Sequence, residues 1–208
     1  MSNNQEILAA EQQHLAAVSR VNYFDLVIDH GQGAIVTDAD GRDYIDLLAS
    51  ASATNVGHAH PKVVAAITQQ AQKLIQYTPA YFANTTTAQL VQRLTALTPG
   101  TFEKQALFGN SGSDANDAMI KLARAYTGRS YIVSFTGAYH GSTYGAMSIS
   151  GVSLNMTRKM GPLLPDVVKV PYPDPSQRLA GETDAQFSQR LFQAFKLPFE
   201  TYLPDRKS

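Results

Sequence analysis

Small and hydroxyl-bearing residues at Ser111–Ser113 stand directly before a stretch with helical periodicity. The apolar residues that follow fall on one helix face: Ala118, Met119, Leu122, Ala123 and Tyr126. The first amide groups of a helix lack intrahelical acceptors, and Gly112 lets the backbone approach an anion closely. Ser111 with Asp114 three residues later resembles a capping box. The pattern predicts an anion-binding helix N-terminus, and an ordinary capped helix is the alternative.

A second chemical group, Tyr139–Gly141, follows a run rich in β-forming residues, Ser130–Phe135. A short apolar run before the helix, Lys104–Phe108, predicts another buried strand. A strand–helix–strand unit implies parallel pairing of the two strands, and the carboxyl ends of parallel strands usually face one ligand crevice. We therefore expect Tyr139 to stack on a flat ring whose phosphate lies at Ser111–Ser113. A tyrosine that only packs is the alternative.

Turn residues and periodicity predict the remaining elements. They are a helix over Gln5–Val18, a hairpin of Ala34–Thr37 with Arg42–Leu48, a helix opened by Pro61, a helix over Leu90–Leu97, a strand at Val167–Val170 and a last helix around Phe187–Phe195.

Three other kinds of site, a metal site, an acid–base pair and a hydrolase triad, have less support from the sequence. His58 and His60 have a spacing compatible with a metal pair, but the sequence places no acidic partner to complete a site, and a turn before Pro61 is the favoured role. His140 with Asp114 or Asp117 suggests acid–base catalysis, against which we favour a hydrogen bond that supports the loop. No Gly-x-Ser-x-Gly elbow surrounds the serines, so a hydrolase triad has little support.

The segments GNSGSDAND and AYHGST resemble the cofactor site of the class III pyridoxal-phosphate-dependent aminotransferases. GQGAIVTDADGRDYIDLLAS and NVGHAHPKVVAAI resemble the N-terminal hairpin and the Gly-His-x-His-Pro turn of the same family. Within the family, RVNYFDLVIDH and SLNMTRKMGPLLP look like the branch of racemases and epimerases that act on branched-chain amino acids. The resemblance covers nearly the whole chain.

The resemblance implies an α/β fold, the N-terminal part of a fold-type I transferase. We expect an incomplete, mainly parallel sheet with flanking helices, preceded by an N-terminal arm and hairpin. Residues 1–55 would form the arm and hairpin, part of the small domain. Residues 56–208 would form an incomplete large domain that binds pyridoxal 5′-phosphate.

The resemblance also implies roles for single residues. The amides of Gly112 and Ser113 would bind the cofactor phosphate, with Ser111 beside them. Tyr139 would stack on the pyridine ring, and His140 would shape the loop beneath it.

Ser142 stands where many family members that act on 4-aminobutyrate or ornithine have an arginine. Serine cannot replace a guanidinium that pairs with a carboxylate through two hydrogen bonds. Ser142 therefore disfavours ornithine or 4-aminobutyrate as the substrate and is compatible with a smaller or apolar amino acid.

Pyridoxal chemistry also needs a lysine for the Schiff base and a carboxylate at the pyridine nitrogen. The resemblance places both downstream of Gly141, at the ends of later strands, and no lysine of this chain stands in such a context. We therefore expect the N-terminal half of a subunit without catalytic residues of its own. Three functions stay open: an aminotransferase, an amino-acid racemase or epimerase, and a non-catalytic truncated product.

The composition of the chain limits the classes of partner that it can bind. The 208 residues carry 17 basic and 17 acidic side chains, so no global field favours nucleic acid or an anionic membrane. No cysteine is present, and no apolar run reaches the length that spans a membrane. We expect small-molecule partners, an amine or amino acid and a 2-oxo acid, with no metal, no nucleic acid and a cytoplasmic location. The family resemblance also implies that the full-length protein forms a homodimer.

Overall fold

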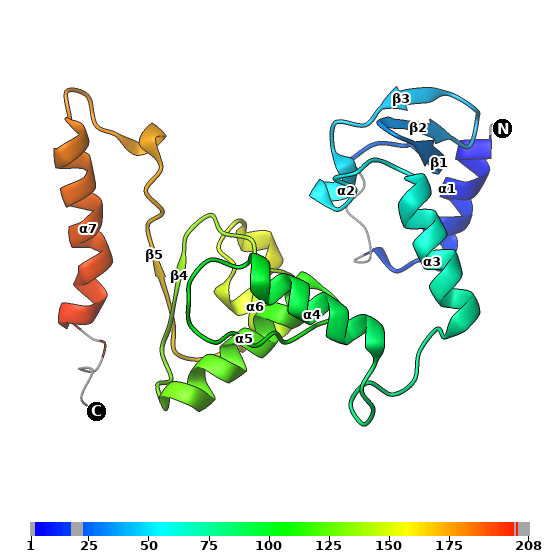
Figure 1. Ribbon diagram of the computed structural model, residues 1–208. Helices are drawn as coiled ribbons and strands as arrows, with labels where there is room; N and C mark the ends of the chain where they lie inside the picture. Colours follow the sequence, from blue (N-terminus) through cyan, green and yellow to red (C-terminus); the bar gives the residue numbers. More distant parts are fainter. Residues whose placement is uncertain (1–2, 18–22, 202, 204–208) are drawn as a thin grey trace. The chain divides into compact units, whose positions relative to one another are not determined.

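A computed structural model describes residues 3–17, 23–201 and 203. The chain divides after Ala88 into two compact units (Figure 1). None of the described helices is long and apolar enough to cross a membrane.

The first unit contains a three-stranded antiparallel sheet in the order β1–β2–β3. Its strands are β1 (Ile28–Gln32), β2 (Ile35–Asp38) and β3 (Asp43–Ile45). The predicted hairpin is confirmed as β2 and β3, although β3 ends at Ile45 and not at Leu48. The sequence did not predict β1, because this short polar strand lacks an apolar alternation.

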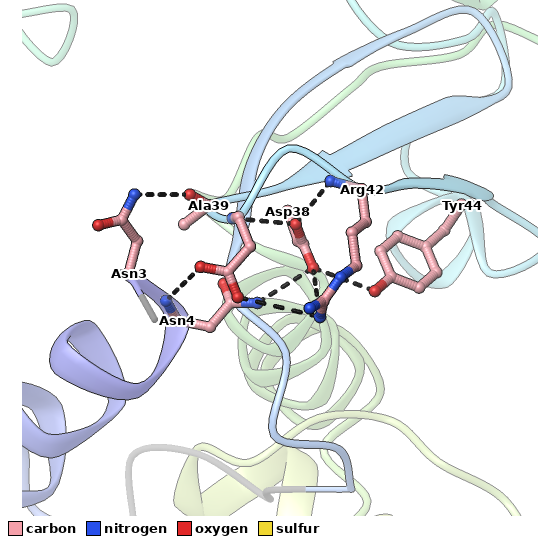
Figure 2. A network of polar contacts seen from close by, with 7 residues as sticks. Asn3, Asn4, Asp38, Ala39, Arg42 and Tyr44 are labelled. Carbon is pink, nitrogen blue, oxygen red and sulfur yellow. Dashed lines mark hydrogen bonds and ion pairs between the residues drawn. The ribbon is translucent and has the colours of Figure 1, made fainter. Parts of the chain in front are cut away.

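Helix α1 (Asn3–His14) attaches to this hairpin through a polar network around the buried Asp38 (Figure 2). The side-chain amide of Asn3 donates to the carbonyl oxygen of Ala39 at 3.0 Å. Asp38 Oδ2 accepts from Asn4 Nδ2 and from the Tyr44 hydroxyl, each at 3.0 Å. A buried carboxylate therefore joins the helix to the sheet.

The helix is shorter at its C-terminal end than the predicted Gln5–Val18, because it ends at His14. Val18 itself lies outside the described residues.

Asp38 remains charged because its hydrogen bonds outweigh its burial. Burial alone would raise the pKa of Asp38, but the backbone amide of Arg42 (2.8 Å), the side chains of Asn4 and Tyr44, and the amide of Asp40 (3.0 Å) all donate to the carboxylate. The pKa therefore lies below the ordinary 3.8. The stability that Asp38 contributes is complete above pH 3.8 and is lost as the pH falls through the lowered pKa.

Asp38→Ala is expected to loosen α1, since it leaves two backbone amides and two side-chain donors without their acceptor. A glutamate-specific protease should then cleave after Glu6 and Glu11 at least about tenfold faster than in the wild type. Asp43→Ala is the control, because the Asp43 carboxylate accepts from Thr37 on the exposed side of the hairpin. Equal cleavage rates in the two variants would contradict the anchoring role.

After β3 the chain makes a left-handed turn, α2 (Ala49–Ser52), in which all four non-glycine residues have positive φ. Asp46 holds its start, because Asp46 Oδ1 accepts from the amides of Leu48 and Ala49 at 2.9 and 2.8 Å. The other oxygen of Asp46 lies 2.6 Å from His58 Nε2. Chain folding therefore gives His58 an acidic neighbour from twelve positions away, which the sequence did not indicate.

Helix α3 (Pro61–Lys73) begins at Pro61 as predicted. The ring of His60 caps it, since His60 Nδ1 accepts from the Lys62 amide at 3.3 Å. His60 therefore has the turn-forming role that the sequence favoured. Among the described residues, no three His, Cys, Asp or Glu side chains gather as metal ligands would.

Helix α4 (Thr85–Leu97) leads into the second unit, where it ends at the predicted residue. This unit continues with α5 (Gly112–Thr127), β4 (Ile132–Phe135), α6 (Tyr144–Ile149), η2 (Leu154–Met156), β5 (Val167–Val170), η3 (Pro175–Gln177) and α7 (Asp184–Thr201). Strand β5 and the last helix occur where the sequence predicted them, and β4 begins two residues later than expected.

Strands β4 and β5 form a parallel pair, with Ile132 opposite Val167 and Phe135 opposite Val170. Helices α5 and α6 lie in the same unit (Figure 1). Its core contains residues from α5, α6, β5 and α7: Ile120, Ala146, Met147, Ile149, Val168, Val170, Phe187 and Leu191.

The predicted strand at Lys104–Phe108 is not formed in the described part of the chain. Its backbone makes no ladder with any described segment, so β4 pairs with β5 and not with this run. Leu107 and Phe108 are 63% and 49% exposed. An apolar run becomes a strand only when a neighbouring strand accepts and donates its backbone hydrogen bonds, and no described segment forms such a neighbour.

Candidate cofactor-binding site

The SGS turn, Ser111–Ser113, begins α5 as the sequence predicted. Ser111 is the N-cap in an extended conformation, and its hydroxyl oxygen accepts from the Asp114 amide at 3.1 Å. Asp114 reaches back, but it accepts from the amide of Asn110 at 2.9 Å and not from Ser111. The capping box is therefore displaced by one residue, and the carboxylate secures the chain that enters the turn.

Two backbone amides of the SGS turn stay without an acceptor. Within the described chain, the N–H groups of Gly112 and Ser113 donate to no hydrogen-bond acceptor, whereas Asp114 and Ala115 donate to Ser111. A Cβ added to Gly112 would have no atom within 4 Å. The start of α5 thus presents two free donors and open space, with the positive end of the helix dipole behind them.

The aromatic loop, residues 139–143, packs directly on the SGS turn. Gly141 has φ +127°, and a Cβ there would lie 2.0 Å from Ser113 Oγ and 2.7 Å from Ser113 Cα. The amide of Ser142 donates to Ser113 Oγ at 3.1 Å, and the hydroxyl of Thr143 donates to the Ser113 carbonyl oxygen at 3.4 Å. The structure therefore brings together the two motifs that the sequence placed at one crevice.

Tyr139 presents its ring to solvent. The side chain is 63% exposed, and its hydroxyl lies 3.3 Å from Ser142 Oγ. Ser142 therefore has two contacts: its amide donates to Ser113 Oγ, and its hydroxyl lies within hydrogen-bond distance of the Tyr139 hydroxyl. An exposed aromatic face beside two free amides suits a planar ligand with an anionic group.

His140 acts through its backbone. Its amide donates to Ser150 Oγ at 3.0 Å, and its carbonyl oxygen accepts from Asn116 Nδ2 at 2.7 Å. The two carboxylates that could have formed an acid–base pair with His140 have other partners, because Asp117 accepts from the amide of Ala146 and Asp114 from that of Asn110. The loop-supporting interpretation of His140 agrees with these contacts.

The sequence analysis missed three residues that hold the loop, namely Asn116, Thr143 and Ser150. It considered Asp117 only as an acid–base partner of His140, whereas Asp117 accepts from the Ala146 amide at the start of α6. A usable signal existed for Asn116 and Asp117. Asn116 and Asp117 follow Ser113 by three and four positions, so all three share one face of α5.

Two described lysines donate to backbone carbonyl oxygens. Lys104 Nζ donates to the carbonyl oxygens of Thr98 and Gly100 at 2.7 and 2.6 Å. Lys169 Nζ donates to the carbonyl oxygen of Ser150, and desolvation lowers the pKa of Lys169 below its ordinary 10.5. The expectation that this chain supplies no Schiff-base lysine stays a prediction.

Comparison with known proteins gives a consistent set of relatives. The family model for class III aminotransferases matches residues 15–201. The chain is 59% identical over 199 residues to the isoleucine 2-epimerase of Lentilactobacillus buchneri, covering 96% of this chain and 44% of that protein. It is 39% identical over 165 residues to a probable 4-aminobutyrate aminotransferase of Bacillus subtilis, covering 79% of this chain and 38% of the relative.

An (S)-enantioselective omega-transaminase from Thermomicrobium roseum has a similar structure, with a TM-score of 0.84 and 29% sequence identity. The similarity covers 95% of this chain and 46% of the transaminase. The chain therefore spans less than half the length of these relatives, and the expected fold class, the N-terminal part of a fold-type I transferase, is confirmed. The chain belongs to the class III aminotransferase family.

Proposed function

We propose that this chain binds pyridoxal 5′-phosphate, with the phosphate at the SGS turn and the pyridine ring against Tyr139. The observation that carries the proposal is the pair of free amides at Gly112 and Ser113, which lie next to a loop with an exposed tyrosine. A phosphate offers acceptors to both amides, and its charge is favoured at the start of a helix. The residues present therefore fit the cofactor that the family resemblance implies.

The chain's own residues would do three things for this cofactor. The SGS turn binds the phosphate, Tyr139 covers one face of the ring, and the hydrogen-bonded backbone of His140 fixes the height of the loop. When bound, the cofactor supplies a ring that withdraws electrons from the α-carbon of an amino acid. The catalytic lysine and the carboxylate for the pyridine nitrogen are expected from the remaining part of the family fold.

Two reactions fit this half-site. Amino-group transfer between an amine or amino acid and a 2-oxo acid is the reaction that the aminotransferase relative suggests. Epimerisation of a branched-chain amino acid is favoured by the 59% identity to an isoleucine 2-epimerase. Ser142 also favours it, because Ser142 stands where many members that act on 4-aminobutyrate or ornithine have an arginine, and serine offers no guanidinium to pair with a substrate carboxylate. Incubating L-isoleucine with the completed enzyme, with and without a 2-oxo acid, separates the two, because only transamination needs the oxo acid.

The completed enzyme is expected to need a second copy of the subunit. We propose that it works as a homodimer, in which residues 1–55 belong to the small domain and residues 56–208 to the large one. A cytoplasmic location also stays a prediction. Without the remaining part of the fold, the isolated chain is expected to bind the cofactor and not to turn over a substrate.

The binding proposal is tested by titrating the chain with pyridoxal 5′-phosphate and, separately, with pyridoxal. Loss of the phosphate should weaken binding at least about tenfold, because hydrogen bonds to a charged group are among the stronger ones. Fluorescence of the ligand or equilibrium dialysis measures both affinities. Equal affinities for the two ligands would show that the SGS turn is an ordinary helix cap and that the proposed function is wrong.

A further inference from the structure

One face of α5 holds the aromatic loop at two points and the start of α6 at a third. Ser113, Asn116 and Asp117 lie at i, i+3 and i+4, and their side chains point to the same side of the helix. Ser113 Oγ accepts from the Ser142 amide at 3.1 Å, and Asn116 Nδ2 donates to the carbonyl oxygen of His140 at 2.7 Å. The helix whose first turn carries the free amides therefore also places the loop.

Asp117 makes the third contact, at the start of α6. Its Oδ1 accepts from the Ala146 amide at 2.6 Å, while the N-cap residue Thr143 makes no side-chain cap bond. Asp117 thus serves as a cap that comes from another helix, and its negative charge suits the amide end of α6. A Cβ on Gly145 would lie 2.4 Å from Asp117 Oδ1, so glycine at this position allows the close approach.

Ser150 completes the arrangement from the end of α6. Its hydroxyl accepts from the His140 amide at 3.0 Å and donates to the Ala146 carbonyl oxygen at 2.8 Å. Both polar backbone groups of His140 are therefore bonded, one to α5 and one to the residue that ends α6. Fixing the backbone of His140 sets the direction in which the chain leaves Tyr139.

We propose that Asn116 and Asp117 are positioning residues that hold the ring of Tyr139 at a set height over the SGS turn, and we call them the loop clamp. The inference rests on the proposed function, since it assigns the clamp to the ring and not to the phosphate. A stacked ring requires placement within about 0.5 Å, and loop residues alone rarely give this precision. The clamp transfers the rigidity of α5 to a loop that includes glycine.

The chemistry of each position is specific. The amide of Asn116 is a donor toward a carbonyl oxygen, which an aspartate of the same shape cannot be. Asp117 faces a backbone N–H, and an asparagine of the same shape can still accept from it. Asn116→Asp should therefore disrupt the clamp, whereas Asp117→Asn should largely preserve it and Asp117→Ala should not.

Two ligands separate the clamp from the phosphate site. Asn116→Asp is expected to weaken binding of pyridoxal 5′-phosphate about tenfold and to change the affinity for inorganic phosphate by less than about twofold. Asn155→Asp is the matched control, because it makes the same change in charge on an exposed side chain of the same unit that bonds to no described residue. The control should leave both affinities unchanged. Equal weakening for both ligands would overturn the positioning role.

Hydrogen exchange of the loop provides a readout that needs no ligand. In Asn116→Asp and Asp117→Ala, the amides of His140 and Ala146 should exchange at least about tenfold faster than in the wild type, with the β4 and β5 amides unchanged. Unchanged exchange at the amides of His140 and Ala146 would overturn the clamp. If the wild type binds neither ligand, the proposed function of the isolated chain is wrong, and exchange alone decides the clamp.

Discussion

Gly141→Ala is expected to lower the free energy of unfolding of the second unit by about 2–4 kcal/mol and to weaken pyridoxal 5′-phosphate binding roughly 100-fold. A methyl group at this position would lie 2.7 Å from Ser113 Cα, and a backbone atom of a helix cannot turn aside as a side-chain end can. The loop must move away from α5 instead, which breaks the hydrogen bond from Ser142 to Ser113 Oγ. The positive φ of +127° adds strain for any residue with a Cβ.

Gly137→Ala is the matched control for this effect. Gly137 has φ +81°, but an added Cβ would have no atom within 4 Å, so the variant has the backbone strain without the collision. It should cost about 1 kcal/mol and leave cofactor binding within about threefold of the wild type. Chemical denaturation and ligand titration measure both quantities. If the two glycine variants behave alike, close packing of the loop on the SGS turn is not what the site requires.

Gly112→Ala should weaken pyridoxal 5′-phosphate binding without lowering the stability of the fold, unlike Gly141→Ala, which lowers both. Gly112 lies in the first turn of α5 without positive φ, and an added Cβ would contact nothing. Alanine is also the better helix former, so stability should stay equal or rise by up to about 1 kcal/mol. A methyl group in the open space beside the free amides should still weaken pyridoxal 5′-phosphate binding about tenfold or more, because the phosphate must approach the backbone closely.

Pyridoxal, which has no phosphate, is the ligand control for Gly112→Ala. Its affinity should not change, because the substitution affects the phosphate end alone. A thermal melt confirms that the fold is kept. A variant that is equally stable and binds pyridoxal 5′-phosphate as well as the wild type would mean that the phosphate does not lie at Gly112.

The sequence predicted the local features of the site well. The N-cap at Ser111, the start of α5 and the loop after β4 all depend on residues a few positions apart, for which backbone and capping preferences are decisive. The sequence also predicted that the SGS turn and the aromatic loop meet, but it argued this from two paired strands, and the strand expected before the SGS turn is not formed in the described chain. Their contact is confirmed at Ser113 and Ser142.

Pairings distant in sequence could not be predicted in the same way. Lys104–Phe108 and Ser130–Phe135 both have strand composition, but composition does not specify the neighbour, and β4 pairs with β5 across an interval of more than thirty residues. The hydrogen bond from Asn116 to His140 also depends on how α5 lies against the loop. Helical periodicity can place Asn116 on one face of α5, but it gives no information about the partner of that face.

The unpaired run Lys104–Phe108 has a consequence for solutions of the protein. Its backbone donors and acceptors have no ladder partner in the described chain, and Leu107 and Phe108 expose apolar surface beside them. Such a segment is a template on which another extended chain can pair. Because the run ends just before the SGS turn, self-association there would make the apparent affinity for a ligand depend on protein concentration. Affinities of this chain are therefore best compared on dilute samples, at one fixed concentration for every variant.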